Sequence, residues 1–254
     1  MLSDLNSVLF VTLLPLIIVA QAVVVIWLVA HFGSDSIPAN QVFQTALEKL
    51  AEAVPASATL SDAERLQLLL LSQFNFYLLL IPAMIAIGFA TFSIVDEKLS
   101  RSLEPLLATP VRTWELLLGK ALSGAIPALL VTWVCAGCFL LCTVLLGWGH
   151  LLSLMITPSW FLTMFLLTPT VALLSFILGI IGSSRASDSK SAQNLAVLIV
   201  IPVLVIIGVQ LTGRIWFTTL PTLLLALGVG LVDVLGLLVA TRLFQRESIV
   251  VKWR

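Results

Sequence analysis

Apolar residues gather in six long segments that are separated by shorter polar stretches. About 20 consecutive apolar residues suffice for a helix to cross the hydrocarbon core of a bilayer, and the only charged residue inside the six segments is Asp233. Backbone N–H and C=O groups in lipid must be paired within the protein, and runs that are apolar throughout are typical of helices, not of the alternating strands of a barrel. The pattern predicts an all-α integral membrane protein, a six-helix transmembrane bundle with spans at 8–32, 74–95, 121–147, 159–182, 193–211 and 217–241.

Each predicted span contains one proline. Proline lacks the N–H that would complete a helical hydrogen bond, and its ring crowds the preceding turn. Each proline therefore marks a kink or a helix start that neighbouring helices must accommodate, and these positions are either ordinary members of membrane helices or hinges. The six are Pro15, Pro82, Pro127, Pro169, Pro202 and Pro221.

The composition supports the membrane assignment and excludes several classes of protein. Of the 254 residues, 60% are apolar and 10% are charged, whereas a soluble domain carries about 25% charged residues. A soluble enzyme is therefore excluded. The 13 basic and 13 acidic residues cancel, which leaves no basic face for a nucleic acid. The partner that the composition itself implies is the lipid bilayer.

Basic residues predict which ends of the spans face the cytoplasm, because Lys and Arg in short loops resist translocation. Ten of the thirteen lie in three segments that six alternating spans place on one side. We therefore predict a multi-pass protein of the cell membrane, inner or plasma, with both termini in the cytoplasm. No basic residue precedes Lys49, so we expect the first span to be retained and not cleaved as a signal peptide. The ten basic residues are Lys98, Arg101, Arg112, Lys120, Arg185, Lys190, Arg242, Arg246, Lys252 and Arg254.

The outer loop at 33–73 is predicted to be helical. Residues 41–54 place apolar side chains on one helical face with charged residues between them, and Pro55 ends this amphipathic segment. Its simplest role is that of a lid on the outer mouth of the bundle.

A second outer helix is predicted from a capping motif. Ser61 and Glu64 have the spacing at which a serine hydroxyl caps the amide three residues on, while the glutamate reaches back to the serine amide. We expect a helix to begin at Asp62 and to continue without a break into the span at 74–95.

The cytoplasmic loop at 96–120 carries both signs of charge beside an apolar stripe. It holds four acidic and four basic residues, and Pro105 interrupts the stripe. Thr109 followed by Pro110 provides a helix N-cap and a proline at the first helical position, which predicts a new helix leading into the third span. The loop is therefore either a surface that docks another protein or a solvated connector.

This loop resembles the signature loop of ABC-2 type transporter permeases, the membrane subunits of ATP-driven exporters. Its residues read E-K-x-x-x-S-L-E-P-L-L-A-T-P-V-x-x-x-E-L-L-L-G-K, and the polar loop at 183–194 and the basic tail are similar to the corresponding parts of that family. The resemblance implies that loop 96–120 holds the coupling helix, which contacts a separate ABC ATPase subunit. It also implies a second permease subunit, either an identical copy or a paralogue. The residues onto which the coupling role is carried are Glu97, Arg101, Glu104, Pro110, Glu115, Gly119 and Lys120.

The chain has no phosphate-binding loop, because Gly119-Lys120 lacks the upstream glycine and the hydroxyl partner of that motif. It is therefore predicted not to be an enzyme and to bind no cofactor, with ATP and Mg²⁺ held by the partner ATPase. His31 and His150 are far apart in sequence and do not have the spacing of a metal site.

Three cysteines share one face of the third span, at Cys135, Cys138 and Cys142. They are either small packing residues or a relay for a soft metal such as Cu(I). Spacings of three and four along one helix imply no disulfide framework.

Asp233 is the candidate functional residue inside the membrane. An ionised carboxylate there costs several kcal/mol unless it is paired or hydrated. The residue is either a group that lines the transport pathway or a protonated acid that is hydrogen-bonded to a neighbour. Ala226 and Gly230 are small residues four apart that would let another helix approach, so we expect Asp233 to face protein.

Three functional hypotheses follow. The preferred one is the permease subunit of an ABC exporter that works as a dimer and is coupled through loop 96–120 to its ATPase. The second is a carrier driven by an ion gradient with Asp233 as the coupling acid, and the third is a membrane scaffold without transport. The transported substrate is not indicated by the sequence.

Overall fold

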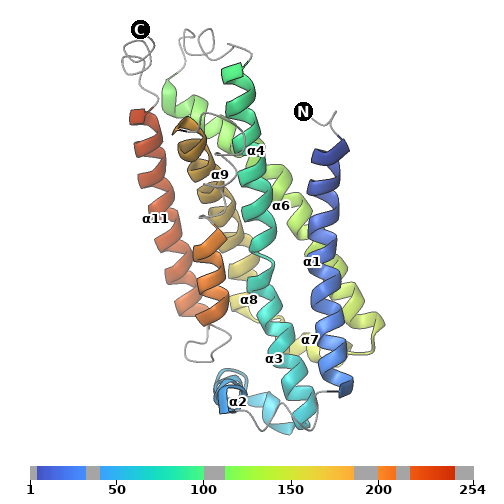
Figure 1. Cartoon of the computed structure of the whole chain (residues 1–254). Coiled ribbons are helices and arrows are strands. Elements are labelled where there is room, and N and C mark those ends of the chain that lie inside the picture. The colour runs from blue at the N-terminus through green and yellow to red at the C-terminus, as the bar shows by residue number, and fades with distance from the viewer. Residues whose placement is uncertain (1–4, 33–40, 100–111, 186–199, 210–217, 244–254) are drawn as a thin grey trace. The chain divides into compact units, whose positions relative to one another are not determined.

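The computed structural model describes residues 5–32, 41–99, 112–185, 200–209 and 218–243, and within these ranges every regular element is a helix (Figure 1). The helices are α1 (Leu5–Phe32), α2 (Gln41–Ala53), η1 (Pro55–Thr59), α3 (Asp62–Tyr77), α4 (Leu80–Leu99), α6 (Thr113–Leu145), α7 (Gly149–Met155), α8 (Pro158–Leu162), the π-helical turn η2 (Thr163–Leu167), α9 (Thr168–Arg185) and α11 (Thr219–Leu243). The predicted all-α class is confirmed for the part of the chain that the structure describes.

Within the described ranges, four helical stretches are long and apolar enough to cross a membrane: Asp62–Ala90, Thr113–Leu145, Pro158–Gly182 and Thr219–Leu243. They overlap the second, third, fourth and sixth spans that the sequence predicts. Where the first and fifth spans are expected, the structure describes shorter apolar helical stretches, Leu13–Val29 and Val200–Val209. These stretches indicate a multi-pass membrane protein. The count of six spans and the position of the termini stay predictions.

The chain divides into two compact units, and α4, α6 and α11 contribute residues to both. Unit 1 consists of Met1–Ile81, Val131–Leu167 and Val203–Leu225. Unit 2 consists of Pro82–Leu130, Thr168–Pro202 and Ala226–Arg254.

In unit 1, α3 is the central element and packs against α1, α2, α7 and η2. Its core side chains are almost completely removed from solvent, Leu66 and Leu69 at 1% exposure and Leu71 at 0%. Phe74 stacks on Phe139 of α6 with ring centroids 3.7 Å apart. These contacts make α3 the scaffold on which the neighbouring elements are positioned.

The helices predicted at 41–54 and from Asp62 form where the sequence predicts them. In α2, Ala46 and Leu50 are buried at 1% exposure while Glu48 and Glu52 are exposed, so the amphipathic pattern is confirmed. The helix ends at Ala53, and η1 begins at Pro55. Because the buried side chains all lie on one face, α2 packs through that face on α3 and η1.

The predicted capping box is present at the start of α3. The Glu64 amide donates to the Ser61 hydroxyl at 3.4 Å, and the Ser61 amide donates to the Glu64 carboxylate at 2.9 Å. Arg65, one turn into the helix, donates from Nε to the Ser57 carbonyl at 3.0 Å and from its terminal nitrogen to the Ala58 carbonyl at 2.5 Å. The cap and the arginine together fix η1 to α3.

The helix expected from Asp62 enters the second predicted span without a break, but it is interrupted within that span. Helix α3 ends at Tyr77 and α4 begins at Leu80. The break lies one turn before Pro82, which has no N–H to donate to the Leu78 carbonyl. The Ile81 amide donates to that carbonyl instead, at 3.1 Å, in the tighter geometry of a turn.

A second irregularity precedes α9. The turn η2 is π-helical, and Pro169 lies five residues after Met164, so it cannot supply the N–H that a π-turn would direct to the Met164 carbonyl. The indole N–H of Trp133 on α6 donates to this carbonyl at 3.2 Å. The side chain of one helix thus satisfies the backbone group that the proline leaves open.

In unit 2, α9 packs against both α6 and α11 through positions that lack side chains. A methyl group at Gly124 of α6 would overlap the ring of Phe176 on α9. A methyl group at Gly236 of α11 would lie 3.1 Å from Cγ2 of Ile177, also on α9. The glycines thus leave room for side chains of α9, the Phe176 ring at Gly124 and the Ile177 side chain at Gly236.

Candidate functional site

The first candidate site is the beginning of α6, where the predicted coupling loop leads into the membrane. The amides of Glu115 and Leu116 donate to the Arg112 carbonyl at 3.0 and 3.1 Å. The Arg112 amide donates to the carboxylate of Glu115 at 3.1 Å. Glu115 therefore satisfies one of the amides that a helix start leaves open, and its negative charge lies at the positive end of the helix dipole.

Three residues of the predicted coupling set lie in this described part of the chain. Glu115 and Gly119 are exposed and Lys120 is half-buried. A spacing of four places Glu115 and Gly119 on one face of α6, and the space around Gly119 is open, since a methyl group added there would meet no atom within 4 Å. The start of α6 thus presents an exposed surface that is compatible with docking.

The rest of the coupling set is described less fully. Glu97 belongs to the last turn of α4, of which the backbone alone is described. Arg101, Glu104 and Pro110 lie outside the described residues, as does the helix start predicted at Thr109. The coupling role of all seven residues stays a prediction.

The second candidate site is Asp233 on α11. Its side chain is buried at 8% exposure, and neither carboxylate oxygen has a hydrogen-bond partner among the residues that the structure describes. Gly230 and Gly236 lie one turn to either side of it on the same helical face. Because a methyl group at Gly230 would lie 3.8 Å from Cγ2 of Thr170 on α9, this is the face of α11 that packs on α9.

The three cysteines of α6 form no disulfide. Cys135 is buried and the other two are half-buried. Over the described residues, no group of three or more His, Cys, Asp or Glu side chains has the arrangement of a metal site. The structure therefore adds no support for a soft-metal relay over a packing role.

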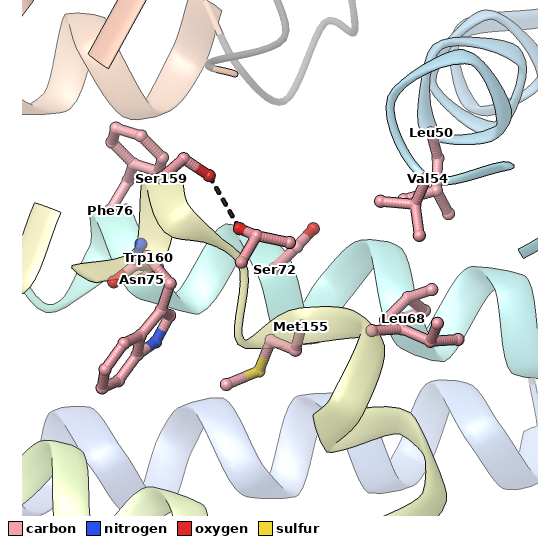
Figure 2. Close-up of a pocket in the computed structure, with 11 residues that line it drawn as sticks. Leu50, Val54, Leu68, Ser72, Asn75, Phe76, Met155, Ser159 and Trp160 are labelled. Carbon is pink, nitrogen blue, oxygen red and sulfur yellow. Dashed lines mark hydrogen bonds between the residues drawn. The ribbon is translucent and has the colours of Figure 1, made fainter. Parts of the chain in front are cut away.

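A polar cavity on unit 1 was not predicted from the sequence. It has a volume of ≈ 40 Å³ and lies between α2, α3 and the segment that joins α7 to α8 (Figure 2). Its polar lining residues are Ser72, Asn75, Thr157 and Ser159, and the apolar walls include Leu50 and Met155. The signal in the sequence was the series of amides and hydroxyls, Gln67, Ser72, Gln73 and Asn75, in the part of the helix that follows its charged first turn and is otherwise apolar.

The comparison with known families gives a match that covers well over half of the chain. The family model described as ABC-2 family transporter protein matches residues 34–229. No curated protein matches the chain. The matched region contains the whole of loop 96–120 and the cavity residues, and it ends before Asp233.

The family match agrees with the resemblance of loop 96–120 and with the four helices, among the described residues, that are long and apolar enough to cross a membrane. An ABC-2 permease is a transport subunit and is generally not itself catalytic. The chain belongs to the ABC-2 transporter family and is a multi-pass permease subunit of an ABC transporter.

Proposed function

We propose that this permease exports its substrate as a dimer, with two copies of a separate ATPase docked on loop 96–120. The observation that carries the proposal is that the family match spans this loop, which leads into a single continuous helix, Thr113–Leu145. A helix of 33 residues is about 50 Å long at 1.5 Å per residue. A push on its exposed start would therefore be transmitted along the helix to residues deep in the membrane.

In this mechanism, ATP and Mg²⁺ bind to the partner subunit and close the ATPase pair. Loop 96–120 moves with the ATPase, and α6 carries the displacement. The cavity between the two permease subunits then changes from inward-facing to outward-facing. The membrane is the inner or plasma membrane, and both termini lie in the cytoplasm with the ATPase.

Copurification tests the proposal most directly. The tagged chain is isolated from its native membrane in a mild detergent, and the soluble proteins that accompany it are identified. We expect an ABC ATPase whose hydrolysis of ATP depends on the permease. A chain that transports its substrate in vesicles without any nucleotide-hydrolysing partner would contradict the proposal.

An ion-coupled carrier remains the second candidate, because Asp233 is buried without a described partner and acids in membrane helices are typical of ion pathways. The two mechanisms respond to different treatments. Export driven by ATP persists when an ionophore collapses the ion gradient and stops when vesicles are depleted of ATP. The carrier gives the opposite result.

A further inference from the structure

Three of the stretches that are long enough to cross a membrane pass from one compact unit to the other beside a proline. Pro82 is the first residue past its crossing, Pro127 lies one turn before its crossing, and Pro169 lies two residues past its crossing. The prolines therefore coincide with the boundaries between the units. The three crossings are Ile81–Pro82 in the stretch from α3 to α4, Leu130–Val131 in α6, and Leu167–Thr168 between η2 and α9.

Each of these prolines weakens the helical stretch in which it lies. Pro82 follows the break between α3 and α4, and Pro169 follows the π-helical turn η2. Helix α6 continues through Pro127, but this residue has no N–H to donate to the Ser123 carbonyl. Sharp bends in helices occur at prolines and at π-helical turns. All three positions should therefore bend more readily than the helix on either side of them.

On the unit 1 side, the three stretches are attached to one another. Phe74 of α3 stacks on Phe139 of α6 with ring centroids 3.7 Å apart. The indole N–H of Trp133 on α6 donates to the Met164 carbonyl of η2 at 3.2 Å. All four residues belong to unit 1, so the ends of the three stretches in this unit should move together.

On the unit 2 side, α6 and α9 are again in contact. The Phe176 ring of α9 occupies the space that a side chain at Gly124 of α6 would need, and Ile177 of α9 lies against Gly236 of α11. These residues all belong to unit 2. Because α6 and α9 are attached to each other both before and after their prolines, neither helix can bend at its proline unless the other bends as well.

Helix α11 is compatible with the same movement. It changes unit after Leu225, so all but its first two turns belong to unit 2. Its proline, Pro221, lies in the first turn, where the amides have no helical partner in any case. This helix can therefore move as one piece with unit 2.

We infer that Pro82, Pro127 and Pro169 together form one hinge, about which the two units of the permease turn relative to each other. Helix α6 stays helical through Pro127, so it can still transmit a push along its axis while it bends at this turn. The hinge is a property of the permease alone, and it does not depend on where the ATPase docks.

The test measures distances between two nitroxide labels by double electron–electron resonance on the full chain in lipid nanodiscs. The labels are attached to cysteines introduced at exposed positions, after Cys135, Cys138 and Cys142 have each been replaced by Ala. One pair reports between the units, and it consists of Leu145→Cys in unit 1 and Leu238→Cys in unit 2. The other pair reports within unit 1, and it consists of Val24→Cys and Leu145→Cys.

We expect the distance distribution between the units to be at least about twice as wide as the distribution within unit 1, because bending is concentrated at the prolines. The triple variant Pro82→Ala, Pro127→Ala, Pro169→Ala restores the missing N–H groups. It should narrow the distribution between the units to the width found within unit 1.

Pro15→Ala is the matched control. Pro15 also lies inside an apolar helix, α1, but the whole of this helix belongs to unit 1. This variant should leave the distribution between the units unchanged. The inference is overturned by a wild-type distribution between the units that is as narrow as the one within unit 1, by a triple variant that stays as wide as the wild type, or by equal narrowing in Pro15→Ala.

The three single variants keep the test decisive if the triple variant does not fold. Since the bends are coupled, each single substitution should narrow the distribution between the units. No narrowing in any of the three contradicts the inference. The permease is measured without its ATPase, so failure of the hinge leaves the proposed coupling mechanism untouched.

Discussion

Glu64 connects two separate interactions through its two carboxylate oxygens. Its Oε2 accepts hydrogen bonds from the amide and the hydroxyl of Ser61, at 2.9 and 2.7 Å, and its Oε1 lies 3.3 Å from Nε2 of His150. The first interaction caps α3, and the second links the cap to α7. Because both side chains of the Glu64–His150 pair are at least one-third exposed, solvent screens the pair and the cap carries most of the stabilisation.

The first prediction separates these contributions. Ser61→Ala removes the hydroxyl that caps α3 and should lower the free energy of unfolding by about 1 kcal/mol. His150→Gln should have a smaller effect, because it removes the exposed pair and leaves the cap in place. Thermal unfolding of the purified chain in nanodiscs, followed by circular dichroism, measures both. A loss at His150 as large as that at Ser61 would show that the pair, and not the cap, stabilises this end of α3.

The second prediction concerns the contact of α6 with α9. Gly124→Ala places a methyl group into the ring of Phe176, and overpacking of this kind costs about 1–3 kcal/mol. Gly137→Ala on the same helix is the control, because the added methyl group would meet no atom within 4 Å. This substitution should be neutral or stabilise the helix by up to about 1 kcal/mol.

A compensating change tests whether the overlap itself is responsible. Phe176→Leu shortens the side chain that faces Gly124, so the double variant should be more stable than Gly124→Ala alone. The two residues are in contact, so their effects are expected to be non-additive. Additive losses in the same unfolding assay would indicate that Gly124 is required for another reason.

Features that depend on local sequence were predictable. The capping box of α3, the apolar face of α2 and its end before Pro55 follow from spacing and residue type within a few positions. The long charge-free segments likewise predicted helices that are long enough to cross a bilayer. The kink or helix start expected at Pro82 corresponds to the break after Tyr77, whereas the exact position of the break was not predicted.

Features that depend on a neighbouring helix could not be predicted. One such feature is the hydrogen bond from the Trp133 N–H to the Met164 carbonyl, and another is the overlap that excludes a side chain at Gly124. Both depend on which helices are in contact. Glu115 illustrates the same point for the candidate site. The resemblance of loop 96–120 to the family's loop predicted a docking role for Glu115. In the structure, its carboxylate accepts a hydrogen bond from the nearby Arg112 amide. A substitution at Glu115 would therefore alter the helix start as well as any docking surface.

The third prediction therefore tests docking at Gly119, where a larger side chain would not disturb the packing around the helix. Gly119 is exposed, and a methyl group added to it would meet no atom within 4 Å. Gly119→Trp should leave the unfolding temperature unchanged and weaken ATPase copurification by at least about tenfold, because a bulky side chain in the centre of an interface prevents close packing.

Ile126→Trp is the control for bulk on the same helix, since Ile126 is 52% exposed and lies two turns away from the predicted docking region. It should copurify with the ATPase like the wild type. If Gly119→Trp also binds the ATPase normally, this face of α6 does not belong to the coupling surface, and the contact must be sought in residues 100–111.

The final prediction distinguishes the two interpretations of Asp233. A buried carboxyl without a partner costs about 1–3 kcal/mol, and such a group persists where function requires it. If Asp233 has a transport role, Asp233→Asn should abolish substrate-stimulated ATP hydrolysis by the reconstituted complex while the unfolding temperature does not fall. Asp233→Leu should go further and raise the free energy of unfolding, because it removes two buried oxygens that have no partner among the described residues from the face that packs on α9. If the acid instead stabilises the fold through a residue outside the described ranges, both variants should unfold at lower temperature and Asp233→Asn should retain hydrolysis in proportion to the folded fraction.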